Sequence, residues 1–164
     1  MRIFKFGGAS VKDAEGIRNV HSVLQTVGFE DVLLVISAMG KTTNALEVVI
    51  KNYFEKSPEL QSSIQEVKKY HNQILLDLFE DDKNAVFKDV NSLFSELDHF
   101  ISQNKSPNYN FVYDQIVSFG ELISTTIISH YMEFMGIKTQ WIDVRNLIKT
   151  DNNYRDANVD WDST

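Results

Sequence analysis

The sequence contains no cysteine, which excludes disulfide bonds and any metal site built on thiolates. The absence of cysteine also fits a reducing compartment. Only 2 prolines and 7 glycines occur among 164 residues, a composition that excludes a collagen-like chain and is not typical of a disordered one. With 43% hydrophobic residues, the chain can form the packed core of one domain or of a large part of one.

Long hydrophobic runs and excess positive charge are also missing. No stretch of about 18 apolar residues is present, so the sequence predicts no membrane-spanning helix. Met1 and Arg2 lead directly into the β-prone residues 3–6, without the apolar segment of a signal peptide. The net charge of −7 repels the phosphate backbone of nucleic acids. We therefore expect a cytoplasmic protein that binds neither membranes nor nucleic acid.

The first 36 residues have the pattern of the start of an α/β domain. Residues 2–6 alternate and end at Gly7 and Gly8, as a strand entering a tight loop does. Residues 11–27 carry apolar side chains at helical spacing. Residues 32–36 are wholly apolar and mostly β-branched, which is typical of a strand buried on both faces of a parallel sheet.

The remainder of the chain is mostly helical in pattern. After a helix at about 44–54, residues 57–104 contain two amphipathic stretches separated by a polar turn, which predicts an αα-hairpin. Residues 111–135 predict another helix and residues 138–143 a third strand, whereas residues 150–164 show no core-facing pattern. Because parallel sheets usually have more strands than three, the chain reads as a truncated domain with the hairpin as an insertion.

The glycine pair after the first predicted strand has two interpretations. Two glycines allow a phosphate to approach the backbone and its N–H groups, Lys5 adds a positive charge, and the following helix directs its positive end to the same place. The alternative is an ordinary turn between a strand and a helix, because such glycine pairs are common.

A second polar loop follows the second predicted strand. Gly40, Lys41 and Thr42 match the end of a P-loop, but the first glycine of that motif would fall on Val35. The dinucleotide-binding glycine pattern fails as well, because Gly7 and Gly8 are adjacent. Ligands bind at the carboxyl ends of strands in open α/β sheets, so this loop is a candidate site. The alternative is that Thr42 or Thr43 caps the next helix.

The long helix predicted near the C-terminal end contains Gly120 followed by Glu121. Glycine in a helix costs about 1 kcal/mol relative to alanine, so either another backbone packs closely or the helix opens there. Glu121 is placed to bind a cationic group, or is an ordinary exposed glutamate. The histidines are scattered without ligand spacing and read as surface or helix-face residues, so no metal site is expected; they are His21, His71, His99 and His130.

Taken together, three segments resemble the aspartate kinases of the amino-acid kinase superfamily: Lys5–Val11, then Ser37–Gly40 with Thr43 and Asn44, and then Ser118–Ser124. The resemblance implies a three-layer αβα, carbamate kinase-like fold, of which residues 1–164 are the N-terminal lobe. It also implies that the helical hairpin at roughly 57–104 is an insertion relative to shorter amino-acid kinases. The second half of the kinase domain and the C-terminal regulatory ACT modules would be absent.

The same resemblance implies the roles of the site residues. Mg-ATP would donate its γ-phosphoryl group to the β-carboxylate of L-aspartate, the first step of lysine, threonine and methionine biosynthesis. Lys5 would stabilise the transferring group, Glu121 would bind the aspartate, and Ser37 and Thr43 would lie against it. The ATP phosphates would be lined by Lys5, Phe6, Gly7, Gly8 and Ala9. Mg²⁺ would be bound through the ATP phosphates, and the parent enzyme would be a homo-oligomer.

The sequence departs from the family pattern in two ways. Ala9 stands where the family often has threonine, which removes one hydroxyl group. More importantly, the missing second half would carry the nucleotide-base site, so we expect the isolated chain to have little or no kinase activity. The alternatives are another acceptor, as in glutamate 5-kinase or acetylglutamate kinase, and a non-catalytic oligomerisation or binding module that uses the apolar stripes of the hairpin.

Overall fold

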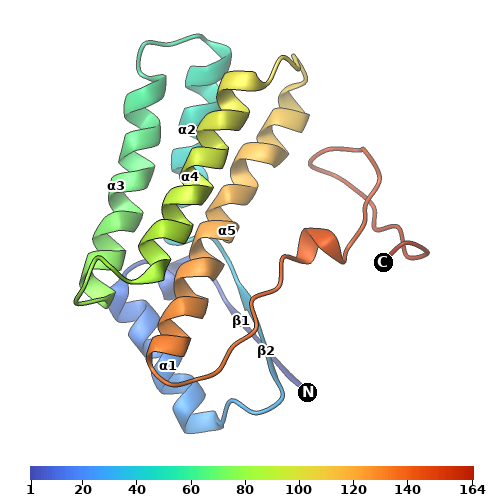
Figure 1. The fold of residues 1–164 in the computed structure, drawn as a ribbon. Coiled ribbons are helices and arrows are strands. Elements are labelled where there is room, and N and C mark those ends of the chain that lie inside the picture. Colours follow the sequence, from blue (N-terminus) through green and yellow to red (C-terminus); the bar gives the residue numbers. More distant parts are fainter.

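The computed structural model describes residues 1–164 and is a mixed α/β structure. Two parallel strands and five α-helices make up most of it, with two short 3-10 turns (Figure 1). In chain order the elements are β1 (Arg2–Phe6), η1 (Gly8–Val11), α1 (Ala14–Val27), β2 (Val32–Ile36), α2 (Thr42–Phe54), α3 (Leu60–Leu78), α4 (Ala85–Gln103), α5 (Tyr109–Phe134) and η2 (Val144–Asn146). None of the helices is long and apolar enough to cross a lipid bilayer.

The two strands pair in parallel, with Arg2 opposite Val32 and Phe6 opposite Ile36. Because side chains alternate along a strand, Phe4 and Leu34 lie on the face that packs against the helical core. The opposite face is open: Leu33 and Val35 are 40% and 45% exposed. The prediction that this strand is buried on both faces is therefore wrong for this chain, because helices cover only one side of the sheet.

The predicted pair of helices at 57–104 is observed as α3 and α4, but the two helices pack mainly on other elements. α3 packs against α2, and α4 packs against α5, while α2 and α5 pack against each other. Figure 1 shows the resulting four upright helices, with α1 and the sheet at one end. The hairpin is thus half of a four-helix bundle and contributes Leu75, Phe94 and Leu97 to the core. That it is an insertion stays a prediction.

The predicted third strand at 138–143 is wrong. These residues have no strand structure, and the only pairing beyond α5 is an isolated bridge between Thr150 and Val159. The segment lies along α5 instead, with Trp141 Nε1 donating to Thr125 Oγ1 at 2.9 Å and Thr139 Oγ1 2.9 Å from Ser129 Oγ. A strand needs backbone pairing with another strand, and no backbone hydrogen bond joins this segment to β1 or β2.

The tail at 150–164 contains no buried residue, and its Tyr154 packs edge-on against Phe111 of α5 with ring centroids 5.3 Å apart. Its clearest contact with the bundle is made by Arg155, whose guanidinium lies 4.2 Å from the ring centroid of Tyr113. Its backbone N–H also donates to the Asp114 carboxylate.

Candidate active site

The loops after β1 and β2 form one structure at the carboxyl ends of the two strands. The N–H of Ser37 donates to the Phe6 carbonyl at 3.1 Å, and the N–H of Gly40 donates to the Gly8 carbonyl at 2.9 Å. These bonds continue the parallel pairing beyond the strands. The two candidate loops predicted from the sequence are therefore adjacent, at the edge where open α/β sheets bind ligands.

Gly8 is required by this close approach. A Cβ atom at Gly8 would lie 2.6 Å from the Ala38 carbonyl oxygen and 3.1 Å from that of Gly40, both of them backbone atoms. Gly7 differs, because a Cβ atom there would have no neighbour within 4 Å. Gly8 thus lets the two loops pack together, and Gly7 leaves open space in front of the first loop.

The N-terminus of α1 follows this loop after a short connection, and its orientation toward an anion at the loop stays a prediction. The 3-10 turn η1 comes first, and α1 is capped by Asp13, whose carboxylate accepts from the Gly16 N–H at 2.8 Å. The amides that remain for an anion belong to Gly8 and Ala9, because the first N–H groups of a helix have no partner within it. A side chain also supplies positive charge near this loop.

Lys5 is that side chain. It is exposed on the open face of the sheet, between Ile3 and the register partner Val35, and it takes part in no hydrogen bond or ion pair of the structure. Its ammonium group is therefore free to meet an anion at the end of β1.

The second loop is fixed from behind by α5. Glu121 Oε1 accepts from the Ala38 N–H at 3.2 Å, and Ser124 Oγ donates to the Ser37 carbonyl at 2.9 Å. Glu121 is half-buried, so its interpretation as an ordinary exposed glutamate is wrong. Ser124 is fully buried, and no separate role was predicted for it.

Gly120 allows α5 to approach this loop. The helix is continuous from Tyr109 to Phe134, so it does not open at the glycine. A Cβ atom at Gly120 would lie 3.0 Å from the Ala38 Cβ and 3.4 Å from the Thr42 Cγ2. The atoms nearest to this position belong to side chains, so the close neighbour that the glycine accommodates is not another backbone, as expected, but the side chains of the second loop and of α2.

The two threonines of the loop have different roles. Thr42 is buried, and its hydroxyl donates to the Met39 carbonyl at 2.6 Å, whereas the helix cap position is Lys41 without a side-chain cap. The N-capping interpretation is therefore wrong for both Thr42 and Thr43. The hydroxyl groups of Ser37 and Thr43 make no hydrogen bond within the chain, and both residues are half-buried. They remain available to a ligand, together with the second carboxylate oxygen of Glu121.

His71 of α3 lies directly behind this loop. It is fully buried, with Nε2 3.3 Å from Thr42 Oγ1 and Nδ1 2.8 Å from the Val67 carbonyl. Burial lowers the pKa of His71 from 6.5 to about 4, although the bond to Val67 acts in the opposite direction. His71 and His21 are thus buried, so the prediction of a surface position is wrong for both of them.

The low pKa of His71 makes the fold sensitive to acid. Between pH 6.5 and about 4 the unfolded chain carries a proton on His71 and the folded chain does not, so falling pH favours unfolding. We expect a loss of about 2–3 kcal/mol of stability between pH 7 and pH 4.5 from this residue alone. Urea unfolding at both pH values should show a smaller loss for His71→Gln than for the wild type. Equal losses for the two proteins would contradict this assignment.

No group of three or more histidine, cysteine, aspartate or glutamate side chains is arranged to ligate a metal ion. The site therefore consists of a free lysine, loop amides, two free hydroxyl groups and one carboxylate. This set can bind an anion on the side of β1 and a small polar molecule with a cationic group on the side of α5. It includes no nucleophile with an adjacent base.

Comparison with known proteins identifies the family of the chain. The sequence profile of the amino acid kinase family matches residues 1–162, so the chain belongs to the amino acid kinase family. Among curated relatives, aspartokinase 1 (chloroplastic) of Arabidopsis thaliana is 31% identical over 86% of this chain and 25% of its own length. A bifunctional aspartokinase/homoserine dehydrogenase 2 of the same plant is 28% identical over 89% of this chain and 16% of its own length.

Solved structures confirm the fold. Aspartokinase III of Escherichia coli, in complex with aspartate and ADP, superposes with a TM-score of 0.83 at 23% identity. The same enzyme with lysine and aspartate gives a TM-score of 0.82 at 24% identity. Both superpositions cover 98% of this chain and 35% of the solved chain. The chain thus spans about a third of the solved relative and a quarter or less of these two curated plant relatives.

Proposed function

We propose that this chain is the N-terminal lobe of an aspartate kinase domain, which transfers the γ-phosphoryl group of ATP to the β-carboxylate of L-aspartate. The observation that carries the proposal is the junction of two loops. A phosphate-binding loop at Gly7–Ala9 adjoins an acceptor loop at Ser37–Thr43, and Glu121 contacts the second. The curated relatives named above are aspartokinases, which favours aspartate over glutamate or acetylglutamate as acceptor.

The residues fit the phosphates of ATP. The open space at Gly7 admits an anion close to the backbone, the amides of Gly8 and Ala9 donate to it, and Lys5 supplies a positive charge. ATP supplies the phosphoryl group, with Mg²⁺ as the counter-ion of its phosphates. Phosphoryl transfer depends mainly on positioning and charge stabilisation, so a site without a nucleophile suits this reaction.

On the acceptor side, the aspartate ammonium group pairs with Glu121, and the hydroxyl groups of Ser37 and Thr43 donate to its carboxylates. An oxygen of the β-carboxylate then forms a bond to the γ-phosphorus as the bond from that phosphorus to the bridging oxygen breaks. The products are 4-phospho-L-aspartate and ADP, and Lys5 stabilises the charge on the transferring group. We propose in addition a cytoplasmic location and a homo-oligomeric parent enzyme.

The 164-residue chain alone is expected to have little or no activity, because it spans about a third of the solved aspartokinase chain. A coupled assay of ADP formation with aspartate should give the background rate for this chain and robust turnover for the complete kinase domain. The same assay with glutamate and with acetylglutamate tests the acceptor. Substantial turnover by the chain alone would contradict the first expectation, and a preference for another acceptor would contradict the second.

A further inference from the structure

Helix α3 places two neighbouring side chains against the two loops of the candidate site. The Tyr70 hydroxyl donates to the carbonyl of Lys12, directly after η1. The same hydroxyl oxygen would lie 2.6 Å from a Cβ atom at Gly40, so it also packs on the second loop. Tyr70 therefore contacts the segment after the phosphate-binding loop and the middle of the acceptor loop at once.

His71 completes this contact from inside the core. Its Nδ1 must carry a proton, because the Val67 carbonyl at 2.8 Å can only accept. Its Nε2 then accepts, so the single hydroxyl proton of Thr42 lies between two acceptors, the Met39 carbonyl and Nε2. This arrangement restricts the rotation of Thr42 at the start of α2. The ring of His71 is in turn packed by Phe94 of α4, with centroids 6.0 Å apart.

These contacts meet where the two loops are joined. Gly40, which Tyr70 covers, donates its N–H to the Gly8 carbonyl. Met39 and Thr42 lie on either side of Gly40 in the same loop. They are joined by the hydrogen bond from the Thr42 hydroxyl to the Met39 carbonyl, and His71 Nε2 contacts the same hydroxyl. Tyr70 of α3 therefore affects the separation of the two loops, and the neighbouring His71 affects the orientation of the second loop.

We propose that Tyr70 and His71 are positioning residues for phosphoryl transfer, through which the α3–α4 hairpin sets the distance between the phosphate-binding loop and the acceptor loop. This inference rests on the proposed function of the two loops. Transfer between two bound molecules depends steeply on their alignment, so a small displacement of either loop lowers the rate. The hairpin is then a working part of the site as well as a part of the bundle core.

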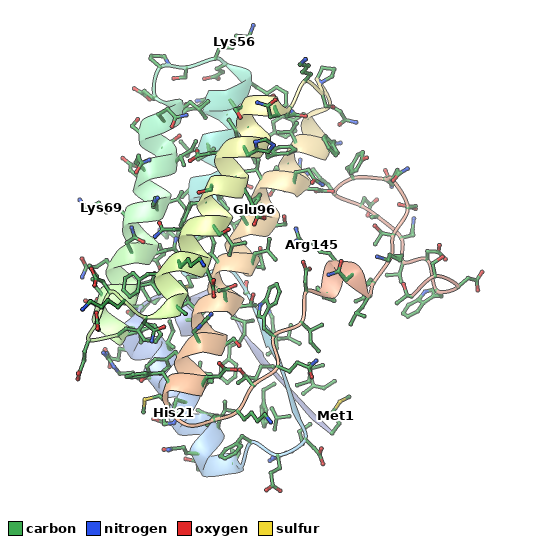
Figure 2. The ribbon with its side chains drawn as sticks, in the orientation of Figure 1. Met1, His21, Lys56, Lys69, Glu96 and Arg145 are labelled. Atoms are coloured by element: carbon green, nitrogen blue, oxygen red, sulfur yellow. The ribbon has the colours of Figure 1, made fainter.

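The chain provides a matched control for Tyr70. Tyr53 of α2 also bonds through its hydroxyl, which donates to the Asn104 carbonyl at 3.0 Å, but at the opposite end of the bundle. Figure 2 marks that end by Lys56, far from Met1 and the sheet. Tyr53→Phe and Tyr70→Phe each remove one hydroxyl group that contacts a backbone carbonyl. His71→Leu removes both hydrogen bonds of the ring, and His71→Gln restores a polar side chain.

The first measurement is amide hydrogen exchange of this chain. Tyr70→Phe and His71→Leu should speed exchange at Gly40 and Thr42 by about tenfold relative to the amides of α4, whereas Tyr53→Phe should leave these two amides unchanged. His71→Gln should lie between His71→Leu and the wild type. The ratio to α4 separates loosening of the loops from a general loss of stability. Unchanged exchange at Gly40 and Thr42 would overturn the inference.

The second measurement is steady-state kinetics of the complete kinase domain. We expect kcat to fall about tenfold in Tyr70→Phe and His71→Leu. In His71→Gln kcat should recover in part, and in Tyr53→Phe it should equal that of the wild type. Loosened loops with an unchanged kcat would overturn the positioning role while the proposed function stands. A wild-type domain that fails to phosphorylate aspartate would instead overturn the proposed function, and the exchange measurement would still report the link between α3 and the loops.

Discussion

Replacing Lys5 with alanine is expected to lower the kcat of the complete kinase domain by about 100- to 1,000-fold, the usual effect of removing one group that stabilises transition-state charge. Lys5 is exposed and forms no ion pair or hydrogen bond in the structure, so its loss removes no stabilising contact. The expected change is therefore in catalysis and not in folding, with a smaller change in the KM for ATP.

Lys69→Ala is the control for the loss of one positive charge. Lys69 is exposed on α3 and lies on the outer side of the bundle in Figure 2. Initial rates at saturating ATP and aspartate, together with urea unfolding of each variant, separate the two effects. An Lys5→Ala enzyme with wild-type kcat would refute the assignment of the phosphate-binding loop.

Alanine at Gly8 is expected to destabilise the fold, whereas alanine at Gly7 is expected to leave its stability nearly unchanged. The Cβ atom at Gly8 would lie 2.6 Å from the Ala38 carbonyl oxygen, and the loops cannot separate without breaking the hydrogen bond from Gly40 to Gly8. We expect Gly8→Ala to lower the free energy of unfolding by about 2–3 kcal/mol through this overlap. Gly7→Ala meets no atom and has an ordinary extended backbone, so its stability should change by less than about 0.5 kcal/mol.

Gly7→Ala should nevertheless weaken nucleotide binding, because the added methyl group fills the space that we assign to the phosphates. Urea unfolding of the chain measures the first effect, and the KM for ATP of the complete domain measures the second. The account is contradicted if Gly7→Ala binds ATP normally, or if Gly8→Ala is as stable as the wild type.

Local sequence patterns predicted the elements of this fold well where the pattern alone determines them. The strand at residues 2–6, the apolar run at 32–36 and the two amphipathic stretches of the hairpin all form the expected elements. Gly28 and Gly136 follow helix ends with φ values of 81° and 84°, as glycines at such ends commonly do. These features depend on side-chain periodicity and on backbone freedom, and both follow from the residue types within a short segment.

Features that depend on partners outside a segment were not predictable in the same way. Residues 138–143 have the composition of a strand, but no backbone hydrogen bond pairs them with β1 or β2. Residues 32–36 have the composition of a doubly covered strand, yet Leu33 and Val35 face an open side of the sheet. The capping of α1 by Asp13 was missed, although an aspartate directly before the first turn of an amphipathic helix is a recognisable N-cap signal.

The candidate site was predicted in part. The sequence identified the two loops and Glu121, and the structure brings the loops together and bonds Glu121 to Ala38. Ser124, Tyr70 and His71 were missed as contributors, because their contacts join segments 29 to 87 positions apart. One signal for them was available in the sequence. Each is a polar side chain on the core-facing side of an amphipathic helix, at a position where an apolar residue is usual.

The central claim is that the loop from Lys5 to Ala9 binds the phosphates of ATP beside the acceptor loop. The most direct test is a crystal structure of the complete kinase domain with Mg²⁺ and a non-hydrolysable ATP analogue. We predict that the phosphate oxygens lie within hydrogen-bond distance of the Gly8 and Ala9 N–H groups and of Lys5 Nζ. Phosphates bound instead at the Gly40–Thr42 segment, with Lys5 facing solvent, would contradict the account.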